Sequence, residues 1–277
     1  MAMARKDYRL IPALQEMASR APAAVDMPLV QIVSNPVSGG HSARRLARLR
    51  DAYIRCGFDV VFSESSPATP FQLIKGVARL CIAGGDGTVR NVLEQGDLRG
   101  STVAVDVYPA GTINLIAREW NVPTDPDAFV QTSITRAPRP LFPVRLNDTN
   151  FLACASIGPD ARAVAGLSAA VKRRIGRLAY VVAMMKVLMD WQRPRLRVFV
   201  DGKRIDCEAV FIAKGRFYAG SWSFAPAARL DEPILHVVAL RRARRCDFAA
   251  FFLAMMAGKT GNLENVQLAT GREVSID

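Results

Sequence analysis

The sequence predicts two domains, an α/β domain followed by a β-rich domain. In the first half, three short apolar runs each lead into a glycine-containing turn and then into a helix-like stretch, which is the pattern of a parallel sheet. The second half reads mainly as strands. Prolines between Pro138 and Pro143 separate the two patterns. We therefore expect an N-terminal extension over residues 1–27, the α/β domain over 28–140 and the β-rich domain over 141–277.

The α/β domain is expected to contain three strand–turn–helix units. Their strands are predicted at 29–33, 80–83 and 102–105, and their helices at 42–50, 89–95 and 114–120. Ligands of an open parallel sheet bind at the carboxyl ends of its strands. The three turns, although distant in sequence, are therefore expected to meet around one ligand.

In the β-rich domain, apolar residues predict strands at 196–200, 204–212 and 234–240. Asp201-Gly202 follows the first of them and is typical of a hairpin turn. The apolar stretch 248–258 contains phenylalanines and methionines that would suit a lipid groove, but core packing is the expectation that we favour.

The turn Gly84-Gly85-Asp86-Gly87-Thr88 carries the most information about chemistry. Glycines directly after an apolar strand let backbone N–H groups approach a phosphate. A carboxylate in such a turn repels phosphate unless a metal ion lies between them or the acid takes up a proton. The combination favours phosphoryl transfer. The turn from Asn35 to Gly40 would, by itself, be equally compatible with a structural loop.

Composition excludes several classes of protein. Half of the 277 residues are apolar, which is enough for a sizeable core. The five cysteines are scattered without a C-x-x-C pair, and only two histidines are present, so we expect no disulfide framework, no zinc site and a reducing compartment. No secretory signal is evident, and no apolar stretch reaches the ~20 residues of a membrane-spanning helix.

A formal net charge of +12 predicts an anionic partner. Charged clusters are usually solvated faces, but a basic face gains about 1 kcal/mol per Lys or Arg near an anionic membrane. Nucleic acid is not expected, because no RNA-binding or helix-turn-helix motif is present. The segment 167–191 is compatible with an amphipathic membrane-facing helix, although a core helix would use the same residues. The basic clusters are Arg44, Arg45, Arg48 and Arg50; Lys172, Arg173, Arg174 and Arg177; and Arg241, Arg242, Arg244 and Arg245.

The three turns, read in order, resemble those of the diacylglycerol kinase family and its sphingosine kinase relatives. The motifs are Asn35-Pro36-Val37-Ser38-Gly39, then Gly84 to Thr88, then Pro109-Ala110-Gly111-Thr112-Ile113-Asn114. Segments 156–161 and 215–220 resemble the second half of that family. The resemblance implies a doubly wound α/β nucleotide-binding domain and an antiparallel, sandwich-like β-rich domain, with the active site in the cleft between them. It also implies an ATP-dependent lipid kinase that phosphorylates diacylglycerol or a similar lipid alcohol.

The resemblance implies roles for individual residues as well. Asp86 would be catalytic, either as a metal ligand or as the base that accepts the proton of the lipid hydroxyl. The cofactors would be ATP and Mg²⁺, with Mg²⁺ spreading the charge of the transferred group. The implied nucleotide-binding residues are Asn35, Ser38, Gly39, Ser63, Gly84, Gly85, Gly87, Thr88, Gly111, Thr112 and Asn114.

The chain departs from the family pattern at two places. Where these kinases typically read Leu-Asp-Asp-Gly-x-Leu, it reads Leu230-Asp231-Glu232-Pro233-Ile234-Leu235. We expect Asp231 and Glu232 to bind the metal ion in a turn that the proline alters. Relatives often continue past an Ile-Asp-like pair to a glutamate that is a proposed proton acceptor. This sequence stops at Ile276-Asp277, so either it is truncated or the base lies elsewhere.

Two alternatives stay open at this point. A soluble-substrate kinase is one, because NAD kinases share the Gly-Gly-Asp-Gly-Thr turn, and a non-catalytic nucleotide- or lipid-binding relative is the other. For the lipid kinase we expect a cytoplasmic protein, peripherally associated with membranes, whose lipid substrate lies at an anionic membrane surface. A homodimer stays open as its oligomeric state.

Overall fold

The first half of the chain folds around a four-stranded parallel sheet with the strand order β2-β1-β3-β4. The computed structural model describes residues 27–36, 41–66, 69–96, 98, 101–165, 186–218 and 220–277. The elements of this domain are β1 Leu29–Ser34, α2 Ala43–Arg55, β2 Asp59–Glu64, β3 Val77–Gly84, α3 Asp86–Gln95, β4 Ala104–Pro109, α4 Leu115–Glu119 and α5 Pro126–Thr135.

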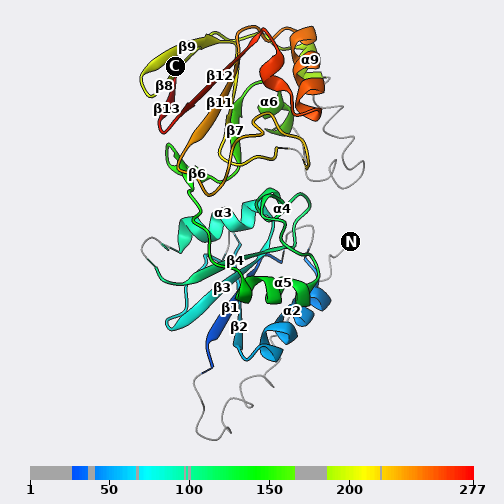
Figure 1. Cartoon of the computed structure of the whole chain (residues 1–277), viewed down its shortest axis with the longest axis vertical. Helices are drawn as coiled ribbons and strands as arrows, with labels where there is room; N and C mark the ends of the chain where they lie inside the picture. The colour runs from blue at the N-terminus through cyan, green and yellow to red at the C-terminus, as the bar shows by residue number, and fades with distance from the viewer. Residues whose placement is uncertain are drawn as a thin grey trace, which may run out of the picture.

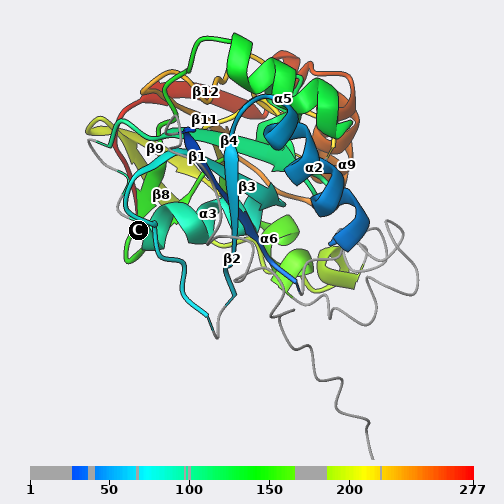
Figure 2. The ribbon, with the colours of Figure 1, turned by 90° about the horizontal axis from the view of Figure 1, so that it is seen from below.

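Helices cover both faces of this sheet, as a doubly wound fold requires. On one face, Ile32 of β1 packs with Tyr53 of α2 and Phe129 of α5. On the other face, Ile82 of β3 packs with Val89 of α3. Seen from below, α2 and α5 lie on one side of the strands and α3 lies on the other (Figure 2). The central strands are therefore buried on both faces, which explains their continuous apolar runs.

The helices begin where the sequence supplies caps. The Ser42 side chain accepts a hydrogen bond from the Arg45 backbone N–H at the start of α2. Asp125 caps α5 in the same way, with Pro126 at the first helical position. The predicted helices are confirmed, and α2 extends five residues beyond the predicted end at residue 50, to Arg55. The third strand lies later than predicted, at Ala104–Pro109.

The second half forms a sandwich of two antiparallel sheets, with the strand orders β12-β11-β10-β7 and β13-β8-β9, and a separate hairpin of β5 and β6. Its elements are β5 Val144–Leu146, β6 Thr149–Phe151, β7 Cys154–Ile157, α6 Pro159–Ala165, β8 Leu196–Val200, β9 Lys203–Cys207, β10 Ala209–Ala213, β11 Leu235–Leu240, α9 Arg245–Met256, β12 Val266–Gly271 and β13 Val274–Ile276.

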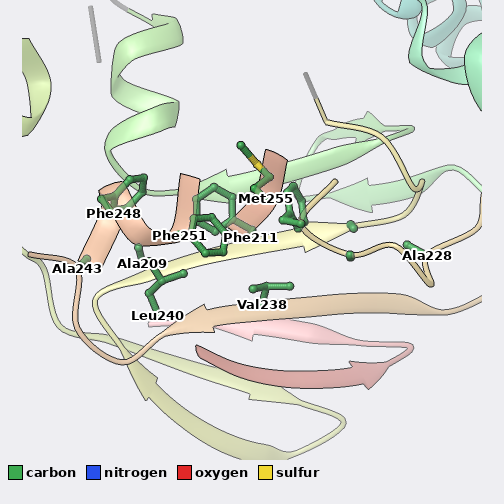
Figure 3. Close-up of a cluster of buried hydrophobic side chains, with 12 residues drawn as sticks. Ala209, Phe211, Ala228, Val238, Leu240, Ala243, Phe248, Phe251 and Met255 are labelled. Carbon is green, nitrogen blue, oxygen red and sulfur yellow. The ribbon is translucent and has the colours of Figure 1, made fainter. Parts of the chain in front are cut away.

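β10 is the central strand of this domain and is buried along its whole length. Val210 and Ile212 point toward β8 and β9 of the second sheet. Phe211, on the opposite face, packs against Phe251 and Met255 of α9 (Figure 3). The core packing expected for the stretch 248–258 is thus confirmed at its buried positions.

The strand predicted over 204–212 is wrong in one respect, because it is two strands in two different sheets. The chain leaves β9 at Cys207 and enters β10 at Ala209. The residue between them, Glu208, turns its carboxylate to the Arg193 guanidinium and to the Ala243 backbone N–H. The hairpin at Asp201-Gly202 is confirmed, since both residues have positive φ, at 47° and 79°.

The two domains are stacked along the long axis of the molecule (Figure 1). The chain passes between them through the extended segment 137–143. α3 and α4 lie on the side of the N-terminal domain that faces the C-terminal domain (Figure 1). Within the parts of the chain given above, no helix is long and apolar enough to cross a bilayer. Residues 1–26 of the predicted extension and 167–185 of the segment 167–191 lie outside the described residues.

Candidate active site

The turns that follow β3 and β4 are in backbone contact at the carboxyl edge of the parallel sheet. The Ala110 N–H donates to the Gly84 carbonyl at 3.2 Å. A Cβ atom on Gly111 would lie 2.4 Å from Gly85 Cα, so only glycine permits this approach. Convergence of these two turns, on which the predicted nucleotide site depends, is therefore present in the fold.

The turn that follows β1 begins at the same edge, because Ser34 is paired with Ala83 at the end of β3. Asn35 comes next in the chain and is half-buried. The order β2-β1-β3-β4 changes direction between β1 and β3. Such a switch point is where α/β sheets bind ligands. Ser38 and Gly39, which were also predicted to bind nucleotide, lie outside the described residues.

Asp86 is the first residue of α3, and its carboxylate connects the second turn to the third. Its two oxygens accept hydrogen bonds from the backbone N–H groups of Leu115 and Ile116, at 3.0 and 3.1 Å. These groups are the first N–H groups of α4, which have no partner inside that helix. Asp86 therefore supplies a negative charge to the N-terminus of α4, where the helix dipole favours it.

Asn114 shapes the third turn from within. Its backbone has the left-handed φ of 54°, which asparagine tolerates better than most residues. Its side-chain amide accepts from the Gly111 N–H and donates to the Gly111 carbonyl, both at 2.9 Å. This amide closes the turn, and the Thr112 side chain is left exposed beside it.

The remaining predicted nucleotide-binding residues differ in their surroundings. Thr88 is buried against Gly84, where a Cβ atom would lie 2.5 Å from Thr88 Cβ, whereas a Cβ on Gly87 would meet nothing within 4 Å. Ser63 lies in β2, two strands from the Asp86 turn, and its hydroxyl accepts from Gln31 Nε2 at 2.9 Å. Thr88 and Ser63 thus already have structural roles, and Gly87 lies beside open space.

Sequence reasoning did not assign a role to Asp160, although it lies within a quoted motif. Its side chain is buried, and one oxygen accepts from Ser156 Oγ at 2.6 Å and from the Tyr218 hydroxyl at 2.8 Å. Among the described residues, the other oxygen has no hydrogen-bond partner. Burial raises the pKa of Asp160 above its ordinary value. An acidic residue shortly after the apolar run that forms β7, at the second position of α6, was the signal in the sequence.

Cys154, the first residue of β7, carries a thiol whose pKa is raised. Burial, followed by the charges of Asp160 and Asp86, raises the pKa of the Cys154 thiol to about 12. Cys154 belongs to β7, whereas Asp86 begins α3 of the other domain. Charges from both domains therefore contribute to the raised pKa of this thiol.

Glu119, the last residue of α4, was also missed by sequence reasoning. Its carboxylate accepts from the backbone N–H groups of Leu230 and Arg216, both at 2.7 Å. Leu230 is fully buried in the same apolar cluster as Val89 of α3 and Ile116 of α4. α4 is therefore held by Asp86 at one end and by the C-terminal domain at the other.

Asp231 and Glu232, the predicted metal ligands, face arginine. Arg229 Nε lies 3.1 Å from Asp231 Oδ1 and 3.3 Å from Glu232 Oε1, and Arg139 lies 3.9 Å from Asp231. The hydrogen bond from Arg229 lowers the pKa of Asp231. In the described part of the chain, no three acidic, histidine or cysteine side chains gather as a metal site would require. The prediction of a metal ion held by these two residues does not fit these contacts.

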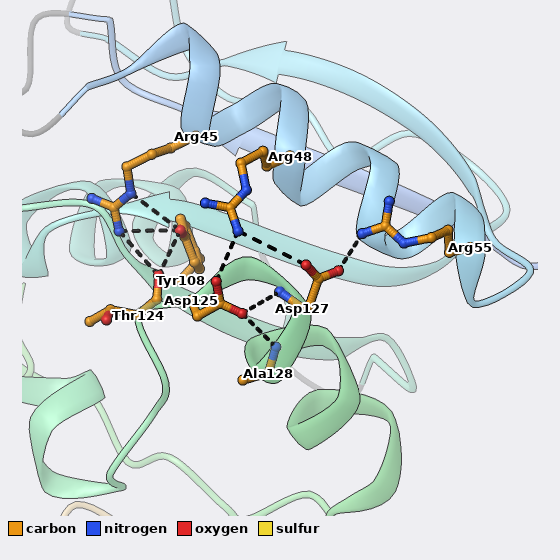
Figure 4. A network of polar contacts seen from close by, with 8 residues as sticks. All are labelled: Arg45, Arg48, Arg55, Tyr108, Thr124, Asp125, Asp127 and Ala128. Carbon is orange, nitrogen blue, oxygen red and sulfur yellow. Dashed lines mark hydrogen bonds and ion pairs between the residues drawn. The ribbon is translucent and has the colours of Figure 1, made fainter.

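The basic clusters are partly occupied by internal contacts. In the first cluster, Arg45 donates to the Tyr108 hydroxyl and Arg48 pairs with Asp125, and Arg55, which lies outside the cluster but on the same helix α2, pairs with Asp127 (Figure 4). In the third cluster, Arg244 pairs with Asp247 at 2.7 Å and Arg245 donates to the carbonyls of Leu188 and Met189. The second cluster, at Lys172, lies outside the described residues.

Fold and site together define a class of protein: a two-domain protein with an α/β domain whose glycine turns meet at a switch point, joined to a β sandwich. Two family models match the two halves. The diacylglycerol kinase catalytic domain matches residues 30–145, and the YegS C-terminal NAD kinase beta sandwich-like domain matches residues 153–277. The chain therefore belongs to the diacylglycerol kinase-like family of lipid kinases.

Proteins with similar sequences or structures are also named as kinases of this family. A diacylglycerol kinase of Mycobacterium tuberculosis is 25% identical, with 90% of this chain and 84% of the relative covered. A Chromohalobacter salexigens protein named "Probable lipid kinase YegS-like" is 29% identical over 60% of this chain, and the match spans only 55% of that relative's length. A crystal structure of a diacylglycerol kinase from Bacillus anthracis has a TM-score of 0.66 at 16% identity, covering 92% of this chain and 87% of that one.

Proposed function

We propose that this protein is an ATP-dependent kinase that transfers the γ-phosphate to the hydroxyl of diacylglycerol or a similar lipid alcohol. The observation that carries the proposal is the backbone contact between the Gly85 and Gly111 turns, with Asp86 between them. The N-terminus of α3 offers backbone N–H groups to a phosphate at this position. Because residues 30–145 match a kinase catalytic domain, the phosphate at this position would belong to the substrate of a kinase.

The nucleotide would lie along the carboxyl edge of the parallel sheet, as its Mg²⁺ complex. The first N–H groups of α3, at Asp86 and Gly87, and the exposed Thr112 hydroxyl would donate hydrogen bonds to its phosphates. The Gly111 N–H is already bonded to Asn114, so Gly111 would instead let the backbone come close to the nucleotide. Asn35 would shape the pocket on the β1 side. The open space beside Gly87 suits a phosphate that approaches the backbone closely. Binding at this edge directs the terminal phosphate toward the C-terminal domain, where the acceptor lipid would lie.

Asp86 would act at the point of transfer. Its carboxylate is the acidic group of the turn, and it begins α3, which lies on the side of its domain that faces the C-terminal domain (Figure 1). With both oxygens held by backbone N–H groups of α4, the side chain has a fixed orientation toward a substrate. In this position it would orient the lipid hydroxyl or accept its proton as the phosphoryl group is transferred.

The test offers labelled ATP together with diacylglycerol, ceramide, sphingosine or NAD in mixed micelles. We expect label in diacylglycerol. Transfer to NAD would instead identify a soluble-substrate kinase, and nucleotide binding without any transfer would identify a non-catalytic relative. Either result would contradict the proposal.

The matched variant for this assay is Asp86→Asn, which keeps one acceptor oxygen for the N-terminus of α4. We expect transfer to fall below a tenth of the wild-type rate, while ATP binding and folding persist. Asp86→Ala should also lose about 1 kcal/mol of stability, because it leaves two N–H groups of α4 without their cap. Transfer above a tenth of the wild-type rate in Asp86→Asn would show that the catalytic role is misassigned.

A further inference from the structure

A lysine ammonium lies against the loop from Arg229 to Glu232, for which the family resemblance implies a metal ion. Lys214 follows β10 directly, and only 1% of its surface is exposed. Its Nζ atom donates to the carbonyl oxygens of Arg229 and Leu230, at 2.7 and 2.9 Å. The Phe142 ring lies 5.7 Å from the same atom and adds a cation–π contact.

The surroundings of this ammonium are those of a cation site. Backbone carbonyls and carboxylates are the oxygen ligands that Mg²⁺ and Ca²⁺ prefer. Burial lowers the pKa of Lys214, and the charges of Glu119, Asp231 and Glu232 oppose that shift. These three carboxylates therefore favour the charged form of the lysine through their negative charges.

Lys214 and a divalent cation would compete for the same oxygens. The carbonyls of Arg229 and Leu230 are already bonded to Nζ, and a second cation within a few ångströms would be repelled strongly in a buried site. The carboxylates of Asp231 and Glu232 face the Arg229 guanidinium, so they are also neutralised from within the chain.

The loop held by Lys214 also connects the two domains. Leu230 accepts from Lys214 through its carbonyl and donates to Glu119 of α4 through its N–H group. Its side chain is buried with residues of α3 and α4. The backbone N–H groups of Lys214 and Gly215 both donate to the Ala153 carbonyl, at 2.8 and 2.9 Å, which anchors the lysine to the start of β7.

We propose that the Lys214 ammonium is the resident cation of the loop 229–232 and that it holds the C-terminal domain on α4 without a divalent metal ion. The metal ion that accompanies ATP is a separate matter, because it enters with the substrate. The consequence is that the fold of the nucleotide-free protein is indifferent to divalent cations.

The experiment measures thermal unfolding of the full chain, free of nucleotide, in EDTA and in millimolar MgCl2 or CaCl2. The wild-type midpoint should be the same in all three. Lys214→Asn should lower the midpoint in EDTA by about 10 °C, because removing the ammonium leaves the carbonyl oxygens of Arg229 and Leu230 without their donor. Because the shorter amide leaves space among oxygen ligands, CaCl2 or MgCl2 should restore part of that loss.

The control is Lys203→Met, which removes an exposed lysine of β9 and should change neither the midpoint nor its response to cations. A wild-type midpoint that rises with either cation would overturn the proposal, as would a Lys214→Asn variant that keeps wild-type stability. A destabilised Lys214→Asn variant that ignores both cations would overturn it too, because the position would then not be a cation site.

If Lys214→Asn does not fold, a calorimetric titration of the wild-type protein with CaCl2 or MgCl2 tests the proposal instead. No saturable binding is expected without nucleotide. Saturable binding that disappears in Glu232→Gln would show that a metal ion occupies the loop beside Lys214, which contradicts the proposal.

Discussion

Two carboxylates of this protein, Asp86 and Asp160, affect its stability in opposite ways. Asp86 gains two backbone hydrogen bonds at a helix N-terminus, an arrangement that stabilises its charge. Asp160 is buried with one oxygen unpartnered among the described residues, and burial raises its pKa. Buried charge of this kind costs stability and is typical of functional sites.

The raised pKa of Asp160 gives a pH dependence with a definite sign. Its folded pKa lies above the unfolded value of 3.8, so its contribution to stability is fully present below that value and is lost as pH rises through the folded pKa. Asp160→Asn removes this titration. The free energy of unfolding of the variant, relative to wild type, should therefore increase between about pH 4 and pH 7.

Urea unfolding at a series of pH values measures this difference. Ser156→Ala is the control, because it removes one hydrogen bond to the carboxylate but leaves the titrating group in place. Its pH dependence should be at least as steep as that of the wild type. A difference between Asp160→Asn and wild type that is constant across the range would show that Asp160 does not titrate with a raised pKa.

At the scale of elements, the site depends on how closely two turns approach. Gly111→Ala would place a Cβ atom 2.4 Å from Gly85 Cα and 2.6 Å from Asn114 Oδ1. The backbone must move to relieve these contacts, at an expected cost of about 2 kcal/mol. ATP binding should weaken with it, because the two turns would separate. Denaturant unfolding and nucleotide titration measure the two effects.

Gly87→Ala provides the comparison for this prediction. A Cβ atom at Gly87 meets nothing within 4 Å, and the residue lies in the first turn of α3. Alanine there should leave stability unchanged or raise it slightly, since alanine favours helix over glycine. Equal losses of stability in Gly87→Ala and Gly111→Ala would contradict the view that close approach of the turns is what requires glycine at Gly111.

α4 is the short element on which the domain arrangement depends. It has five residues, and such a helix is not stable by itself. Asp86 holds its first N–H groups, Glu119 binds the C-terminal domain, and Ile116 and Ala117 are buried. Its position is therefore set by contacts with both domains rather than by its own propensity.

For the whole molecule, the net charge of +12 leads to a prediction about membranes. Binding to anionic vesicles should weaken steeply from low to physiological ionic strength, because exposed charges are screened over about 8 Å at physiological salt. Arg241→Ala combined with Arg242→Ala should weaken it at low salt, as both residues are exposed. Vesicle flotation at several salt concentrations measures both effects.

The matched control is Arg48→Ala, which removes an arginine that is paired with Asp125. Binding should then change less than in the doubly substituted variant, because the arginine charge is already balanced by a neighbouring carboxylate. Salt-insensitive binding would point to insertion of apolar residues and would contradict a role for the basic surface.

The sequence by itself determined the two-domain architecture, the strand–turn–helix units and the family. These features follow from local patterns: continuous apolar runs, glycines after strands, and caps such as Ser42 and Asp125. The convergence of the second and third turns could be predicted as well, because parallel strands bring their carboxyl ends to one edge.

Only the tertiary structure decided what the polar side chains contact. Glu119 and Leu230 are 111 residues apart, and Lys214 reaches a carbonyl 16 residues away. The family pattern at Leu230-Asp231-Glu232 predicts a metal site, whereas the structure shows that the two carboxylates contact Arg229 and that the Leu230 carbonyl accepts from Lys214. Such partners depend on how two domains pack, and packing brings together residues whose separation in sequence carries no signal of their contact.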